Sequence, residues 1–165
     1  GYEVEGFIGI NKQIAGWGSN WAEFFVNFRI KPQLKNLKRD FYNSNSLKNL
    51  ISKIKTVLSQ HEPTISLVHG DLWSGNFGIN TDARGIIFDP ASWWADSEVD
   101  IAMTLLFGGF DQEFYQEYYK ILPKKLGFEK RLFIYNLYHV LNHANMFGGN
   151  YLIQAEEYMK IILDM

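Results

Sequence analysis

The stretch His69-Gly70-Asp71-Leu72-Trp73-Ser74-Gly75-Asn76 decides how this chain is interpreted, together with Phe88-Asp89-Pro90 shortly after it. An aspartate, an asparagine a few residues later and a second aspartate after a turn are the parts of a phosphoryl-transfer site. In such a site one aspartate accepts a hydroxyl proton, while the asparagine and the other aspartate hold magnesium against ATP phosphates. The sequence therefore predicts Asp71 as the base and Asn76 and Asp89 as the magnesium ligands.

Each of these three residues also has an ordinary structural interpretation. Asp71 and Asn76 can be turn residues, and Asp89 can mark the bend before Pro90. Their occurrence together, in the order found in kinases, favours the functional interpretation. Magnesium needs few protein oxygens where phosphates complete its octahedron, so Asn76 and Asp89 suffice as protein ligands.

Two further residues are candidates for supporting this loop. His69, just before the expected base, either braces the loop through a hydrogen bond to backbone or acts directly in catalysis. Bracing is favoured, because phosphoryl transfer needs little beyond positioning and electrostatics. Asp100 is either an aspartate of the first helical turn and nothing more, or a residue that reaches back to hold the backbone of 69–71.

Aromatic and polar residues near the motif are candidate substrate contacts. Trp73 and Ser74 lie inside the loop and are candidate substrate contacts. Trp73 cannot bind metal, so it either packs or contacts substrate, and aromatic faces suit sugar rings and cations. Trp93 and Trp94 either form a wall of the same pocket or pack in the core. His143 either faces a polar substrate pocket or is an ordinary buried, hydrogen-bonded histidine.

The composition indicates a domain with a substantial core and excludes several classes of function. Hydrophobic residues make up 47% of the 165 residues and aromatic residues 16%. A net charge of -2 argues against nucleic acid as a partner, which requires concentrated positive charge. There is no cysteine, no signal peptide is visible and no apolar run is long enough to span a membrane. We therefore expect a cytoplasmic location and no membrane partner.

Apolar residues at helical spacing predict a chain that is mainly α with a small β hairpin. Ser19 or Asn20 can cap the first helix, and Ser97 can cap a later one. Pro32 either bends the first helix or begins a second segment. A short strand is predicted at 65–68, and a hairpin is predicted from 77–80 and 85–88. Helical segments are predicted within 21–28, 47–58, 99–106, 114–121, 132–147 and 151–162.

The motif His-Gly-Asp-Leu-Trp-Ser-Gly-Asn at 69–76 resembles the catalytic loop of the fructosamine (ketosamine) kinases, which are relatives of aminoglycoside and choline kinases. Phe88-Asp89-Pro90-Ala91 resembles the metal-binding segment of that family. The similarity continues through 96–110 and 135–151. It begins near residue 5 and extends to the end of the chain.

The resemblance implies a protein-kinase-like fold, of which this chain is the larger, helical C-terminal lobe. It implies ATP and Mg²⁺ as cofactors and a sugar hydroxyl, at the third carbon of a ketosamine on an amine or protein, as the phosphate acceptor. The product sheds its sugar, which links the family to deglycation repair. By the same match Asp71 is the base, Asn76 and Asp89 are the metal ligands, and Trp73 is a substrate contact.

The chain shows neither a Gly-rich strand-turn-strand nor a strand lysine that could cover the nucleotide. We therefore expect residues 1–18 to be a connector from a missing N-terminal lobe, and residues 1–165 alone to transfer little phosphate. Three alternatives stay open: an aminoglycoside- or choline-type kinase lobe, a pseudokinase that binds without chemistry, and a purely structural helical domain.

Overall fold

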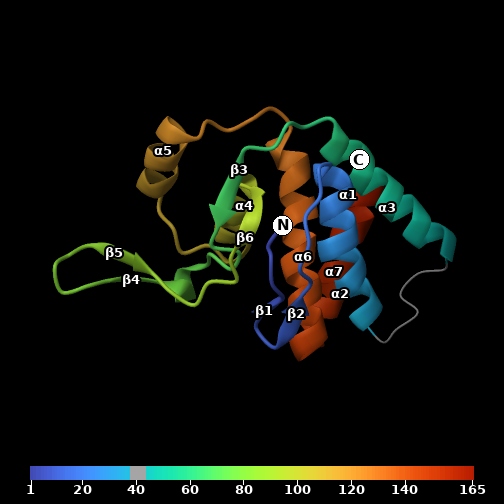
Figure 1. Cartoon of the computed structure of the whole chain (residues 1–165), viewed down its shortest axis with the longest axis horizontal. Coiled ribbons are helices and arrows are strands. Elements are labelled where there is room, and N and C mark those ends of the chain that lie inside the picture. The colour runs from blue at the N-terminus through green and yellow to red at the C-terminus, as the bar shows by residue number, and fades with distance from the viewer. Residues whose placement is uncertain (38–43) are drawn as a thin grey trace.

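A computed structural model describes residues 1–37 and 44–165 of the chain (Figure 1). The described part is mostly helical, as predicted, with small antiparallel sheets. The helices are α1 (Trp21–Phe25), α2 (Lys31–Asn36), α3 (Ser44–Ser59), α4 (Glu98–Phe107), α5 (Gln112–Ile121), α6 (Phe128–Phe147) and α7 (Asn150–Leu163). The strands are β1 (Gly6–Ile8), β2 (Asn11–Gln13), β3 (Ile65–Val68), β4 (Phe77–Ile79), β5 (Gly85–Ile87) and β6 (Trp93–Asp96).

Helix α6 runs through the middle of the helical body (Figure 1). It packs against α4 on one side and against α2, α3 and α7 on others. Most of its residues are buried, because apolar side chains occur all around the helix instead of along one stripe. The central position of α6 fixes the relative places of the elements that carry the candidate site.

The first helical segment begins at Trp21, where the side chain of Asn20 accepts a hydrogen bond from the backbone N–H of Glu23. Of the two predicted caps, Asn20 is therefore the one that the structure uses. A π-helical segment, Val26–Ile30, follows α1. Pro32 lies in the first turn of α2, where its missing N–H costs nothing, so it begins a new segment.

The described residues form three two-stranded antiparallel sheets, so the prediction of a single small hairpin was incomplete. The predicted hairpin is confirmed as β4–β5 and the predicted strand at 65–68 as β3. Strand β6 was not predicted and pairs with β3. Residues 1–18 are also more than a connector, because they contain the β1–β2 hairpin.

The β3–β6 pairing brings the candidate site together. Val68 lies opposite Trp93 in the register of these strands, so the loop that follows β3 meets the segment that precedes β6. The backbone N–H of Ala91 donates to the carbonyl of His69 at 2.9 Å and extends this contact. Segments 69–76 and 88–91 therefore lie at the same end of the small sheet.

The start of α4 differs from the prediction. Ser97 occupies the cap position, but its side chain accepts no capping hydrogen bond. A carboxylate oxygen of Asp96 instead accepts a hydrogen bond from the backbone N–H of Glu98. The residue before the expected cap therefore provides the side-chain acceptor at the start of this helix. Among the described residues, no helix has the length and apolar character needed to cross a membrane.

Candidate active site

The loop after β3 is held by one buried carboxylate. Asp100, in the first turn of α4, accepts hydrogen bonds from the backbone N–H of His69 at 2.7 Å and of Gly70 at 2.9 Å. Burial raises the pKa of Asp100, while these two N–H groups oppose that shift. Of the two interpretations of Asp100, the structure therefore supports the one in which Asp100 holds the backbone of the loop 69–71.

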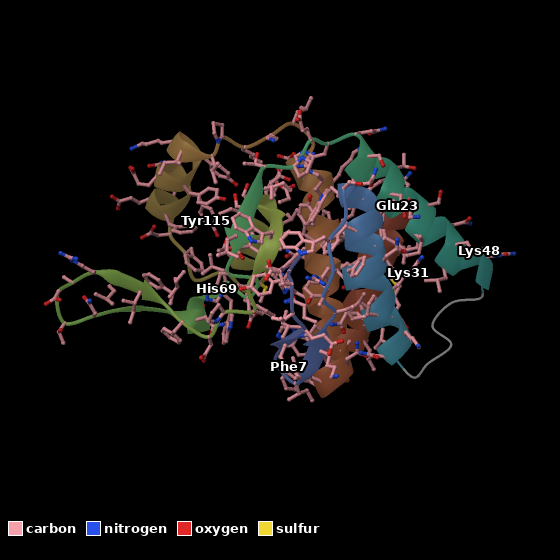
Figure 2. The ribbon with its side chains drawn as sticks, viewed as in Figure 1. Phe7, Glu23, Lys31, Lys48, His69 and Tyr115 are labelled. Carbon is pink, nitrogen blue, oxygen red and sulfur yellow. The ribbon has the colours of Figure 1, made fainter. Side chains whose placement is uncertain are left out.

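The ring of His69 is fully engaged within the same loop. Its Nε2 lies 2.9 Å from the carbonyl of Phe88, and its Nδ1 accepts from the backbone N–H of Asp71 at 3.3 Å. In the neutral form of the ring, these contacts place the proton on Nε2. Figure 2 shows His69 where the β4–β5 ribbon joins the helical body. In this arrangement both ring nitrogens bind protein groups, and neither faces a substrate.

Asp71 and Asn76 are in direct contact. The side-chain amide of Asn76 donates to the Asp71 carbonyl at 2.9 Å and to its carboxylate Oδ2 at 3.2 Å. Burial raises the pKa of Asp71 above its ordinary 3.8. The charges of His143 and His69 and the hydrogen bond from Asn76 lower it, and the nearby Asp89 raises it. Asp71 therefore sits beside both other residues of the predicted triad.

The oxygens of Asn76 and Asp89 suit a hard cation. The amide nitrogen of Asn76 faces Asp71, which leaves its Oδ1 without a hydrogen bond to any described residue. Asp89 is exposed, and its carboxylate likewise forms no ion pair or hydrogen bond within 1–37 and 44–165. Two free oxygen donors, one neutral and one charged, fit Mg²⁺.

Backbone contacts fix where Asp89 lies. The N–H of Phe88 donates to the carbonyl of Asn76 at 3.1 Å, and the carbonyl of Phe88 faces His69. Asp89 itself has φ 53°, a left-handed conformation that is uncommon for a residue with a side chain. This turn aims the chain back toward β6 and places the carboxylate beside the loop that carries Asp71.

Trp73 and Ser74 lie at the open side of the loop. The Trp73 ring is 39% exposed, covers Gly75 and meets the ring of Phe107 edge-on at 6.0 Å. Ser74 is half-buried, and Gly109 approaches it so closely that a side chain at 109 would collide with it. An exposed aromatic face beside Asp71 is available to a substrate.

His143 lies among aromatic rings instead of in a polar pocket. Its ring centroid is 5.2 Å from that of Phe107, 5.8 Å from Phe147 and 5.0 Å from Tyr151. Its Nδ1 lies 2.8 Å from the carbonyl of His139. Since the ring of Phe107 also contacts that of Trp73, these rings connect His143 to the loop 69–76. The sequence analysis missed this aromatic group because its members come from different helices.

The structure contradicts the assignment of Trp93 as a substrate-binding residue. Its side chain is 0% exposed and stacks with Trp21, Phe24 and Phe25 in the core. Strand β6 directs Trp93 inward, and the neighbouring Trp94 is consequently the exposed one. The core alternative for Trp93 is therefore the correct one.

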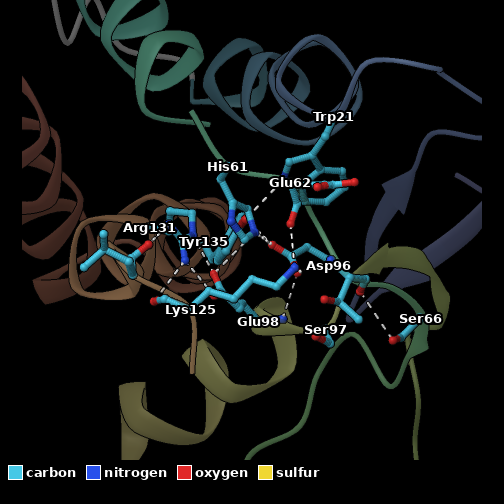
Figure 3. Close-up of polar contacts among 12 residues, drawn as sticks. Trp21, His61, Glu62, Ser66, Asp96, Ser97, Glu98, Lys125, Arg131 and Tyr135 are labelled. Carbon is cyan, nitrogen blue, oxygen red and sulfur yellow. Dashed lines mark hydrogen bonds and ion pairs between the residues drawn. The ribbon is translucent and has the colours of Figure 1, made fainter. Parts of the chain in front are cut away.

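A second cluster of titratable side chains is formed by residues of β6, α4 and the segment after α3 (Figure 3). His61, Asp96 and Glu98 come close enough to share a metal ion. However, their oxygens already bind protein groups: Asp96 accepts from Tyr135, and Glu98 accepts two hydrogen bonds from Arg131. The cluster is a buried ionic network that joins β6, α4 and α6.

Gly70 gives the first testable prediction. It has φ +82°, and a methyl group there would overlap the carbonyl oxygen of Ala91. We expect Gly70→Ala to lower the free energy of unfolding by roughly 1–3 kcal/mol, the cost of such backbone strain, as measured by urea denaturation. Gly78→Ala is the control, because a methyl there makes only ordinary contacts. Equal losses in the two variants would contradict the argument.

Comparisons with known proteins agree with this fold. A crystal structure from Haemophilus somnus, provisionally named a fructosamine-3-kinase, superimposes with a TM-score of 0.89 at 32% identity. It covers 99% of this chain, which corresponds to 56% of that structure. A second structure, from Thermobifida fusca and named in the same way, has a TM-score of 0.84 at 26% identity.

The sequence relatives are kinases. A "Probable ketoamine kinase" of Synechocystis is 44% identical over 97% of this chain and 54% of its own length. The ketosamine-3-kinase of mouse is 41% identical over 92% of this chain and 50% of its own length. This chain therefore spans about half the length of the curated relatives it matches.

The model of the fructosamine kinase family matches residues 1–165, which is the whole chain. The chain belongs to the fructosamine kinase family. The resemblance inferred from the sequence motifs is thereby confirmed.

Proposed function

We propose that this chain carries the catalytic and metal-binding half of an ATP-dependent kinase that phosphorylates a sugar hydroxyl on ketosamine adducts of amines or proteins. The observation that carries the proposal is the direct contact between Asp71 and Asn76, with Asp89 held beside them. The relatives support the substrate class, because they are named for ketoamines, ribulosamines and ketosamines. The names protein-ribulosamine 3-kinase and ketosamine-3-kinase also support phosphorylation at position 3, whereas a role in deglycation repair stays a prediction.

Asp71 acts as the general base in this proposal. As the acceptor hydroxyl forms a bond to the γ-phosphorus of ATP, its proton moves to the Asp71 carboxylate. The bond from the γ-phosphorus to the bridging oxygen breaks, and ADP leaves with that electron pair. Asn76 orients the carboxylate by donating to Oδ2. His69 and Asp100 act as positioning residues, since both bind backbone of the loop or the adjoining segment.

Asn76 and Asp89 would hold Mg²⁺ through their unpaired oxygens. When bound, Mg²⁺ supplies positive charge against the β- and γ-phosphates of ATP. The chain holds the backbone of both residues in place, because the backbone of Phe88 is hydrogen-bonded to the Asn76 carbonyl and to the His69 ring. Neither oxygen needs to give up a protein contact in order to bind the ion.

The substrate would lie against Trp73, Ser74 and His143. The exposed face of Trp73 suits a sugar ring, and the half-buried His143 is close enough to influence the charge of Asp71. The assignment of the chain to a C-terminal lobe, the cytoplasmic location and the slow turnover of residues 1–165 alone stay predictions.

The pH dependence of the reaction should reveal the coupling between His143 and Asp71. Base catalysis needs the ionised carboxylate, so activity is lost as pH falls through the Asp71 pKa, which burial raises. His143 lowers that pKa. We expect His143→Phe, which keeps an aromatic ring, to move the acidic limb of kcat/KM to higher pH. Tyr151→Phe, an aromatic neighbour without charge, should leave the limb in place. A limb that does not move in His143→Phe would refute the coupling.

The test of the proposed function is ADP release by the protein expressed from its complete reading frame. Mg·ATP is supplied with fructosyl-lysine, ribulosyl-lysine, an aminoglycoside or choline, and Asp71→Asn is the control. Turnover on the ketosamines alone, lost in the variant, supports the proposal. Turnover only on another amine would support kinase activity but would contradict the proposed ketosamine substrate. Binding of Mg·ATP without turnover on any acceptor indicates a pseudokinase.

A further inference from the structure

Arg29 is a buried cation without an acidic partner. Its side chain is 1% exposed and forms no ion pair with any residue in 1–37 or 44–165. Nη1 donates to the carbonyls of Ile14 and Phe28, and the guanidinium lies 4.0 Å from the centre of the Trp93 ring. Nε is buried and makes no hydrogen bond. Carbonyl oxygens and ring faces carry no full negative charge, whereas buried charges in proteins are normally paired.

A cavity of about 100 Å³ lies beside this guanidinium. Residues of the β1–β2 hairpin and of the segment that follows Asp89 line it, and among the described residues Arg29 is the only charged one that does. The other lining residues with hydrogen-bonding side chains are Tyr2, Gln13 and Ser92. Gln13 is already bonded to Ala91 and Tyr138, whereas the Ser92 hydroxyl has no partner in the described part of the chain.

One residue that lines the cavity is a glycine at an inward position of the hairpin. Gly6 lies opposite Gln13 in the β1–β2 register, and opposite residues of an antiparallel pair direct their side chains to the same face. Gln13 and Ile8, on that face, are both buried. A Cβ added at Gly6 would meet no atom within 4 Å. The space that a side chain would fill at this position is therefore empty.

We propose that this cavity binds a small oxyanion of the phosphate type, held by the Arg29 guanidinium and the Ser92 hydroxyl. A water molecule occupies roughly 30 Å³ in the liquid, so the cavity has room for a group of a few heavy atoms. It is too small for a nucleotide, since pockets for larger ligands measure roughly 300–1,000 Å³. A guanidinium donates strong, charge-assisted hydrogen bonds to oxyanions, and Nη2 of Arg29 donates to no residue within 1–37 or 44–165. Asp71, Asn76 and Asp89 do not line this cavity, and the proposal does not depend on the proposed kinase reaction.

The test follows the Arg29 Nε–H resonance by NMR while inorganic phosphate is added to the protein expressed from its complete reading frame. EDTA removes metal ions, and sodium chloride keeps the ionic strength constant. We expect a saturable shift with one phosphate per chain. Gly6→Val, which fills the cavity and leaves Arg29 in place, should weaken binding at least tenfold, and Ser92→Ala should weaken it severalfold.

Lys12→Val is the matched control. Lys12 pairs with Phe7 on the outward face of the same hairpin and does not line the cavity. Removal of the Lys12 charge should change the affinity for phosphate less than twofold. If phosphate were instead attracted non-specifically to surface charge, Lys12→Val would bind it more weakly. The proposal is overturned if the Arg29 resonance does not shift saturably, or if Gly6→Val binds phosphate as tightly as the unaltered protein.

Discussion

Asp71→Asn should lower kcat for phosphate transfer to the acceptor by roughly 10²–10⁴-fold, the usual contribution of a positioned general base. The asparagine has the shape of the aspartate and can still accept the hydrogen bond from Asn76, so the loop should keep its conformation. It cannot take up the acceptor proton. Affinity for Mg·ATP should change much less, because Asn76 and Asp89 provide the oxygens assigned to the metal.

The measurement is initial-rate ADP release over a range of acceptor concentrations, together with nucleotide binding by calorimetry. Asp82→Asn is the matched control. Asp82 lies in the exposed turn between β4 and β5, and its substitution removes the same charge as Asp71→Asn. A fall in kcat of less than about tenfold in Asp71→Asn would remove Asp71 as a general base. An equal fall in both variants would attribute the effect to net charge.

The local part of the site could be predicted from the sequence because its members are close along the chain. Asp71 and Asn76 belong to one loop and meet through one side-chain amide. Asp89 follows a hairpin whose turn was recognisable from residues 81–84. In the structure the side chain of Asn80 accepts hydrogen bonds from two backbone N–H groups of that turn. These contacts depend on turn chemistry, which short sequence windows contain.

The non-local parts could not be predicted in the same way. Strand β6 consists of only four residues and is paired by β3, so its existence depends on a partner far away in the sequence. The pairing also decides that Trp93 faces inward and Trp94 outward, since a shift of one residue reverses the two faces. The sequence analysis therefore left Trp93 with two interpretations.

The residues 1–18 show the same limit. Their glycines and mixed composition resemble a connector, yet Asn11 and Gln13 make specific contacts with distant elements. The Asn11 amide donates to Asn142 on α6, and the Gln13 amide donates to Ala91. Hydrogen bonds across 131 and 78 positions leave no periodic pattern in the sequence. Only the packed chain shows that this hairpin supports the segment beside Asp89.

Arg131→Met should be among the most destabilising single substitutions in the chain. Arg131 donates to both carboxylate oxygens of Glu98, at 2.6 and 2.7 Å, and the two side chains are only 4% and 11% exposed. The variant leaves the largely buried Glu98 carboxylate without Arg131. His61, whose Nε2 lies 3.8 Å from Glu98 Oε2, then remains as a partner only when it is protonated. Leaving one member of a buried pair uncompensated costs roughly 3–5 kcal/mol. Urea denaturation with a constant m-value measures the loss.

A second variant separates the stranded charge from simple loss of packing. In Arg131→Met/Glu98→Met both charges are gone, and apolar replacement of a whole buried pair is often nearly neutral. We therefore expect the double variant to be more stable than Arg131→Met. Lys124→Met, which breaks the exposed pair with Glu129, should cost less than about 1 kcal/mol. If Arg131→Met costs no more than Lys124→Met, the network in Figure 3 does not stabilise the junction of β6, α4 and α6.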